Sequence, residues 1–217
     1  MSLLLILIFN FNKNLHSFKN YIFYYKKGEI MTDVNKVANP TTLGLFGFGV
    51  TTILLSLANL GILDLSMVII AVAIVLGGFA EIIAGILEFK IGNTFAGTVF
   101  VAFGLFWLSL VLILLLPEIG AVGAADPVSI GVYLLIFALF SLLLFVNTLK
   151  SILTFKILMT LVTLLFLTLG ISYLGVLLPD IFMTLGGIIG VLAGLLGIYI
   201  STGMIINGDW AEEVFKL

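Results

Sequence analysis

The stretch SMVIIAVAIVLGGFAEIIAGILEF, residues 66–89, decides the fold class. A helix needs about 20 mostly apolar residues to cross a bilayer, and this run is long enough while holding only two charged residues, Glu81 and Glu88. The whole chain has the same character, since 62% of its 217 residues are hydrophobic and 9% are charged. Soluble domains average about 25% charged residues. A soluble fold of this size could not bury so much apolar surface, so an integral membrane protein is predicted.

Five further apolar segments of comparable length are present, at residues 43–63, 95–116, 128–146, 152–178 and 181–206. Pro117, Pro127 and Pro179 fall at the ends of these segments, where a missing N–H costs a helix least. We therefore predict an all-α membrane domain of six transmembrane helices over residues 43–206. Residues 31–42 would be a cytoplasmic N-terminus, and residues 207–217 a solvated cytoplasmic tail.

The lysines set the orientation of this six-helix pattern. From residue 31 onward they all fall on one side of it, and the chain has no arginine: Lys36, Lys90, Lys150, Lys156 and Lys216. The loops of the other side carry acids: Asp64, Glu118, Asp126 and Asp180. Because positive loops stay in the cytoplasm, both termini are predicted to be cytoplasmic in a multi-pass protein of the cell (plasma) membrane. The two sets of three helices would then run in opposite directions, as in an inverted repeat.

Several classes of function are disfavoured by what the sequence lacks. There is no cysteine, so neither disulfides nor a thiolate metal site are expected. The single histidine, His16, has no second ligand beside it, and no basic patch points to nucleic acid. We therefore expect no metal site, no cofactor and no enzymatic activity, because the intramembrane acid has no recognisable nucleophile or metal partner.

The first thirty residues do not read as a membrane span or a signal peptide. The apolar run at residues 3–9 is too short to cross a bilayer, and its positive charges follow it rather than precede it. Residues 27–30, KGEI, can be encoded as AAA-GGA-GAA-ATT, which resembles a ribosome-binding site directly ahead of Met31. Residues 1–30 are therefore expected to be a mis-annotated or disordered N-terminal extension, with an amphipathic cytoplasmic tail as the alternative.

Polar and small residues recur at helical spacing inside several spans. The stripes are Gly44, Phe48, Thr52, Ser56 and Asn59; Gly78, Glu81, Gly85 and Glu88; Tyr133, Phe137, Ser141 and Thr148; and Thr160 with Thr163. Polar groups in a bilayer should face other helices or water, so four such faces favour a central path. The alternative is close helix packing alone. For the last span, where Gly186, Gly190 and Gly194 repeat every four residues, packing is the favoured interpretation.

Glu81 is the most informative single residue of these stripes. An ionised carboxylate is expensive in hydrocarbon, so a side chain at this depth is either a proton carrier or gate, or a neutral carboxyl that hydrogen-bonds a neighbouring helix. Both interpretations stay open. Glu88, near the end of the same span, is expected to be structural and to be helped by Lys90.

The segment NPTTLGLFGFGVTTILLSLANLG, residues 39–61, opens the first span with helix breakers. Asn39 suits an N-cap and Pro40 the first helical position. The glycines allow another backbone to approach, and the free N–H groups of a helix start favour an anion. The motif could therefore form one mouth of a path that attracts carboxylates.

This segment resembles the NPAPLGL-type signature of the acetate uptake transporters, here Asn39, Pro40, Leu43, Gly44 and Leu45. Residues 77–117, GGFAEIIAGILEFKIGNTFAGTVFVAFGLFWLSLVLILLLP, are similar to that family's second conserved region. The resemblance covers residue 38 to the end of the last span. It implies a hexameric ring of six-helix protomers, a fold similar to that of the proton-gated urea channels, and a path in each protomer for acetate, with succinate in some members, usually coupled to protons.

The resemblance also implies a narrowing of the path at Phe48, Phe103 and Val162, which would form a hydrophobic constriction. Phe103 stands where the family has Tyr, Glu81 where many members have Gln, and Thr41 and Thr42 where Ala and Pro are typical. The expected substrate path adds Asn39, Pro40, Gly44, Thr52, Ser56, Asn59, Glu81, Ser141 and Thr163. Rival functions are a passive channel for acetate or for urea or ammonia, and a structural or sensory membrane protein.

Overall fold

The structure is a computed structural model that describes residues 38–217, so the expectations for residues 1–30 and for Lys36 lie outside it. Within the described residues all regular structure is helical, and six segments are long and apolar enough to cross a membrane. Five are single helices: α2 (Thr41–Asn59), α5 (Thr94–Glu118), α6 (Pro127–Thr148), α7 (Leu153–Leu174) and α8 (Pro179–Trp210). The six-helix prediction is thereby confirmed.

The remaining span, Met67–Lys90, is made of three consecutive segments: α3 (Met67–Val72), the π-helix η1 (Ala73–Ala80) and α4 (Glu81–Lys90). A π-helical stretch is rare and is often found at functional sites. Here it ends immediately before Glu81. The wider turn also carries Gly77, at which an added Cβ would lie 2.7 Å from the Trp107 ring of α5.

Local sequence explains where the helices begin and end. Asn39 Oδ1 accepts a hydrogen bond from the Thr41 N–H at 3.1 Å, so it caps α2 as expected, although Pro40 occupies the N-cap position and the helix begins one residue later than predicted. Asp126 caps α6 by accepting from the Ser129 N–H at 2.9 Å. The Ser129 side chain and N–H beside it hold the pKa of Asp126 below its usual value. Pro127 and Pro179 lie in the first turns of α6 and α8.

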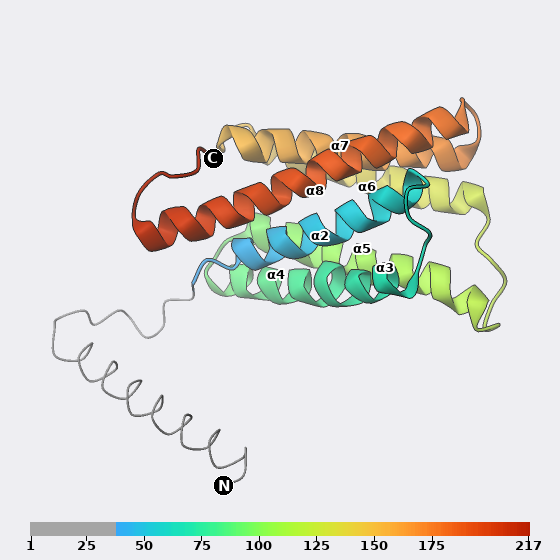
Figure 1. Ribbon diagram of the computed structural model, residues 1–217, viewed down its shortest axis with the longest axis horizontal. Helices are drawn as coiled ribbons and strands as arrows, with labels where there is room; N and C mark the ends of the chain where they lie inside the picture. Colours follow the sequence, from blue (N-terminus) through green and yellow to red (C-terminus); the bar gives the residue numbers. More distant parts are fainter. Residues whose placement is uncertain (1–37) are drawn as a thin grey trace, which may run out of the picture. The chain divides into compact units, whose positions relative to one another are not determined.

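Figure 1 shows the spans running side by side along one axis, with the connecting loops at its two ends. Lys90, Lys150, Lys156 and Lys216 lie at the end where α2, α5 and α7 begin, which we call the lysine end. Asp64, Glu118, Asp126 and Asp180 lie at the opposite end. The separation of charges that the sequence predicted is therefore present in the structure.

Helix α8 packs against both α2 and α7 through its glycines. A Cβ at Gly186 would lie against Leu169 of α7, and a Cβ at Gly194 would lie 2.6 Å from the Gly49 carbonyl oxygen of α2. The reverse also holds, because a Cβ at Gly49 would lie 2.7 Å from the Gly194 carbonyl oxygen. Glycine is required where two backbones come this close. The predicted packing role of the last span is confirmed.

The C-terminal tail is exposed at its acids, Asp209, Glu212 and Glu213, but its last residues are tied to α8. Asn207 Oδ1 accepts from the N–H groups of Val214 and Phe215, each at 2.9 Å. The Tyr199 hydroxyl donates to the Lys216 carbonyl at 3.0 Å. The tail therefore folds back on its own helix at the lysine end.

Candidate solute cavity

A cavity of about 190 Å³ lies among α2, α5, α6 and α7. Most of its wall is aliphatic or aromatic, with a few hydroxyl, amide and indole groups. The lining residues are Phe48, Thr52, Leu55, Ser56, Ala58, Asn59, Leu65, Phe103, Phe106, Trp107, Leu110, Leu114, Ile130, Leu134, Leu165, Phe166, Leu169 and Tyr173. Leu65 belongs to the exposed loop after α2, so the cavity reaches the end of the bundle opposite to the lysines.

Aromatic rings fill the space on the inner side of this cavity. Phe103 of α5 stacks on Phe166 of α7 with ring centroids 5.8 Å apart. Phe106 contacts the same Phe166 ring at 4.9 Å and Phe137 of α6 at 4.8 Å. Phe48 adds a ring from α2 and is 8% exposed. Because stacked and edge-to-face rings pack without polar groups, the inner wall of the cavity offers a solute only apolar surface.

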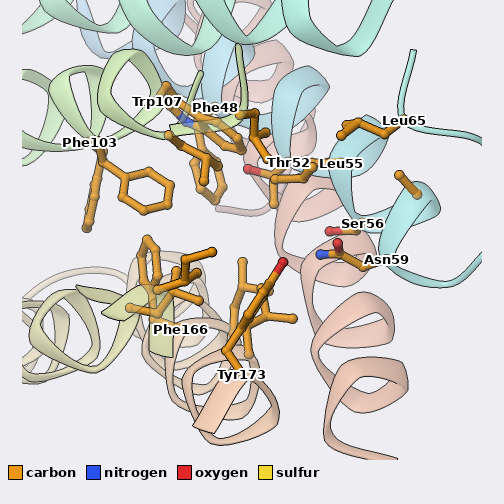
Figure 2. A pocket seen from close by; sticks show the side chains of 18 residues that line it. Phe48, Thr52, Leu55, Ser56, Asn59, Leu65, Phe103, Trp107, Phe166 and Tyr173 are labelled. Atoms are coloured by element: carbon orange, nitrogen blue, oxygen red, sulfur yellow. The ribbon is translucent and has the colours of Figure 1, made fainter. Parts of the chain in front are cut away.

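The polar groups of the cavity lie mainly along one face of α2. Thr52, Ser56 and Asn59 follow Phe48 at intervals of about one turn, and all four line the cavity. Figure 2 shows these side chains together with Tyr173 of α7. The stripe predicted for the first span is therefore a stripe of cavity-lining residues, except for Gly44. That glycine faces Phe100 of α5, where an added Cβ would collide with the ring.

Thr52 differs from the threonine next to it. The Thr51 hydroxyl donates to the Gly47 carbonyl of its own helix at 2.8 Å. The Thr52 side chain is 1% exposed, and its hydroxyl has no hydrogen-bond partner. A buried hydroxyl without a partner costs about 1–3 kcal/mol, so this group is one that a solute in the cavity could satisfy.

Glu81 lies outside the cavity lining, at the start of α4 and fully buried. Neither carboxyl oxygen of Glu81 makes a hydrogen bond. The polar group beside this carboxyl is the indole of Trp107. Trp107 lines the cavity. The structure therefore places Glu81 behind the cavity wall, with one aromatic side chain between the carboxyl and the solute space.

Glu88 is held differently from the expectation. Its Oε1 accepts a hydrogen bond from the Thr41 hydroxyl at 2.5 Å, and its Oε2 accepts from the Asn93 side-chain amide at 2.7 Å. Lys90, the predicted helper, is exposed. Asn93 also accepts from the Ala96 N–H at 3.2 Å and so caps α5. The buried Glu88 carboxyl thus ties the start of α2 to the junction of α4 and α5 at the lysine end.

The remaining predicted path residues are not among those that line the cavity. Ser141 donates to Phe137 O at 2.7 Å and Thr163 to Met159 O at 2.8 Å, so both hydroxyls are satisfied within their own helices. Val162 is buried in the hydrophobic core, one turn before the lining residue Phe166. Asn39 and Pro40 lie at the lysine end, away from the cavity.

Four lining aromatics, Phe106, Trp107, Phe166 and Tyr173, were not predicted. Phe103, Phe106 and Trp107 are spaced i, i+3 and i+4 in the segment FGLFW, which places them on one face of a helix. That spacing was the available signal. Phe166 carries no comparable signal, since it belongs to none of the predicted stripes and has apolar neighbours on both sides in the sequence.

Comparison with known proteins identifies the relationships of the chain. Residues 25–211 match the model of the GPR1/FUN34/yaaH family, so the likeness begins ahead of residue 38. The succinate-acetate/proton symporter SatP of Escherichia coli K12 is 41% identical over 182 residues, 84% of this chain and 96% of that protein. Ammonia transport outward protein 2 of Saccharomyces cerevisiae is 38% identical, over 76% of this chain and 61% of its own length.

One solved structure, described as that of the bacterial acetate channel SatP, superimposes with a TM-score of 0.81 and 40% identity. The superposition covers 84% of this chain and 99% of the SatP chain in that structure. The fold, the family signature and these identities agree with one another. The chain belongs to the GPR1/FUN34/yaaH family.

Proposed function

We propose that the chain transports acetate and related small monocarboxylates, with succinate as a further substrate, across the membrane through the cavity. The observation that carries this proposal is the cavity itself, with apolar walls for the methyl group and a line of polar groups on α2 for the carboxyl group. The names of the relatives support it, since they are described as a succinate-acetate/proton symporter and an acetate channel. One name describes a symporter and the other a channel, so a passive acetate channel is the second candidate.

The same proposal includes the membrane, the orientation of the chain in it and the assembly. The position of the lysines supports a multi-pass protein of the cell membrane with cytoplasmic termini. The cavity would then reach the outer surface, and the signature residues Asn39, Pro40, Leu43, Gly44 and Leu45 would form the cytoplasmic mouth. A homohexamer with one path in each protomer is the assembly that the resemblance implied.

The constriction of the path is proposed at Phe48, Phe103 and Val162, with Phe166 added by the structure. Phe48, Phe103 and Phe166 all line the inner side of the cavity, and Val162 is buried one turn away. A closed ring of apolar side chains excludes hydrated ions by dewetting. Ser141 and Thr163 would lie on the continuation of the path toward the cytoplasm.

Phe48→Ala is expected to reduce selectivity for acetate over larger carboxylates several-fold, because it removes one ring from the narrowest part of the path. Uptake of labelled acetate and of labelled butyrate into proteoliposomes measures the ratio. Phe46→Ala is the matched control, since that ring is 42% exposed and points away from the cavity. Equal ratios in both variants would contradict the constriction, and an acetate rate no greater than in protein-free liposomes would contradict the function.

Two routes for a coupled proton are consistent with the residues present. The proton could be held by Glu81, which is buried and without a partner. It could also travel on the solute as the undissociated acid. The second route is argued below.

A further inference from the structure

Two hydroxyls of the described spans, those of Thr52 and Thr154, are buried without a hydrogen-bond partner, and of these two residues only Thr52 lines the cavity. Four of the other buried hydroxyls, those of Thr51, Ser141, Thr148 and Thr168, donate to carbonyl groups three or four residues earlier in their own helices. Such back-bonding is the ordinary state of Ser and Thr in membrane helices. Three more, those of Thr41, Ser172 and Ser201, donate to groups outside their own helices. Thr52 is equally buried, yet it faces the cavity without a partner.

The electrostatic surroundings of Thr52 are uncharged. None of the eighteen side chains that line the cavity carries a charge. Helix α2 has no ionisable residue, α5 has Glu118 at its far end, and the titratable groups of α6 and α7 that face the region are the tyrosines Tyr133 and Tyr173. Lys156 lies in the first turn of α7, at the lysine end, and does not line the cavity.

An anion in this cavity would therefore have no positive counter-charge. Burying a carboxylate in an apolar site without one is strongly unfavourable. The nearest buried ionisable group behind the wall, Glu81, is itself an acid and could not stabilise an anion. A protonated carboxylic acid has neither problem, because it is neutral and offers both a donor and an acceptor. One hydroxyl, which both donates and accepts, matches it.

We propose that the species bound in the cavity is the undissociated monocarboxylic acid, with its carboxyl group hydrogen-bonded to the Thr52 hydroxyl. This inference rests on the proposed function and specifies its substrate. Each acid carries its own proton, so one proton crosses with each solute molecule, no net charge moves, and no proton-carrying residue is required.

The test measures initial uptake of labelled acetate into proteoliposomes over a pH series at constant total acetate, after subtraction of protein-free liposomes. The rate is expected to fall about tenfold per pH unit above the pKa of the acid, because the neutral fraction falls in that proportion. Recordings on a solid-supported membrane are expected to show no transport current. Acetamide, a neutral isostere, should compete at a pH where acetate is ionised.

Variants locate the binding group. Thr52→Val keeps the shape but removes the hydroxyl, and it is expected to lower the rate and the competition by acetamide about tenfold. Thr51→Val is the matched control and should change both less than twofold, since the Thr51 hydroxyl is already satisfied by Gly47. Glu81→Gln should retain proton-linked uptake. Equal effects of the two threonine variants would overturn the role of Thr52.

The outcomes separate the inference from the proposed function. An acetate current, a rate that follows total acetate rather than the neutral fraction, or loss of proton-linked uptake in Glu81→Gln would overturn the inference and leave acetate transport standing. A rate equal to that of protein-free liposomes at every pH would overturn the proposed function, and the inference with it.

Discussion

Gly194→Ala is expected to lower the stability of the folded protein by about 1–3 kcal/mol, because it overpacks the contact between α8 and α2. The added methyl group would lie 2.6 Å from the Gly49 carbonyl oxygen and 3.1 Å from the Ile53 backbone nitrogen. Both are backbone atoms, which cannot rotate away as a side chain can. The two helices would therefore have to separate. The same contact positions Phe48, whose ring lies beside Gly197, one turn further along α8.

Thermal unfolding in detergent, followed by tryptophan fluorescence, measures this effect. Gly208→Ala is the matched control, because it adds the same methyl group to the same helix at a position with nothing within 4 Å. That change should be neutral or slightly stabilising, since alanine is favoured over glycine in a helix by about 0.8–1 kcal/mol. An unfolding temperature of Gly194→Ala equal to that of Gly208→Ala would show that the helices tolerate separation.

Glu88→Gln is the second change with a large expected effect, about 1–3 kcal/mol of lost stability. The two carboxyl oxygens of Glu88 accept from Thr41 and Asn93 at once, and the side chain is 1% exposed. Glutamine keeps the size but replaces one acceptor by an NH₂ donor. The new NH₂ group would then face either the Thr41 hydroxyl or the Asn93 amide, both of which donate to Glu88. A buried polar group would be left unsatisfied.

The control for this variant is Glu118→Gln, the same chemical change at an exposed residue of the opposite end. It should alter stability by less than about 0.5 kcal/mol. Because Glu88 holds the start of α2, Glu88→Gln is also expected to increase proteolysis of the segment around Asn39 relative to that control. If both glutamine variants unfold at the same temperature, the hydrogen bonds of Glu88 do not stabilise this junction.

The fold was predictable from the sequence because bilayer-spanning length and apolar composition leave few alternatives. The helix ends followed from Pro127, Pro179 and the capping side chain of Asn39. The prediction of a single span over residues 66–89 missed the π-helical segment η1. Nothing in the residues AIVLGGFA separates a π-turn from an α-turn, since both satisfy the backbone hydrogen bonds that a membrane requires.

The cavity was predictable in part. The α2 stripe predicted Phe48, Thr52, Ser56 and Asn59 as neighbours on one face, and all four line the cavity. The stripes of the other spans predicted a shared path, but Gly85 faces the α5 backbone, and Ser141 and Thr163 bond their own helices. Helical spacing shows which residues share a face, but not toward which neighbour that face is turned. The rotation of each helix is set by packing of large aromatics such as Trp107 and Phe166.

The most direct test of transport through this cavity is uptake of labelled acetate by proteoliposomes with and without an inward proton gradient. With the gradient, the protein is expected to accelerate accumulation well above the protein-free rate, Thr52→Val to slow it, and Glu81→Gln to leave it unchanged. Without the gradient, acetate should only equilibrate. Accumulation no faster than in protein-free liposomes, or the same acceleration in Thr52→Val as in the unaltered protein, would contradict a path for the acid along α2.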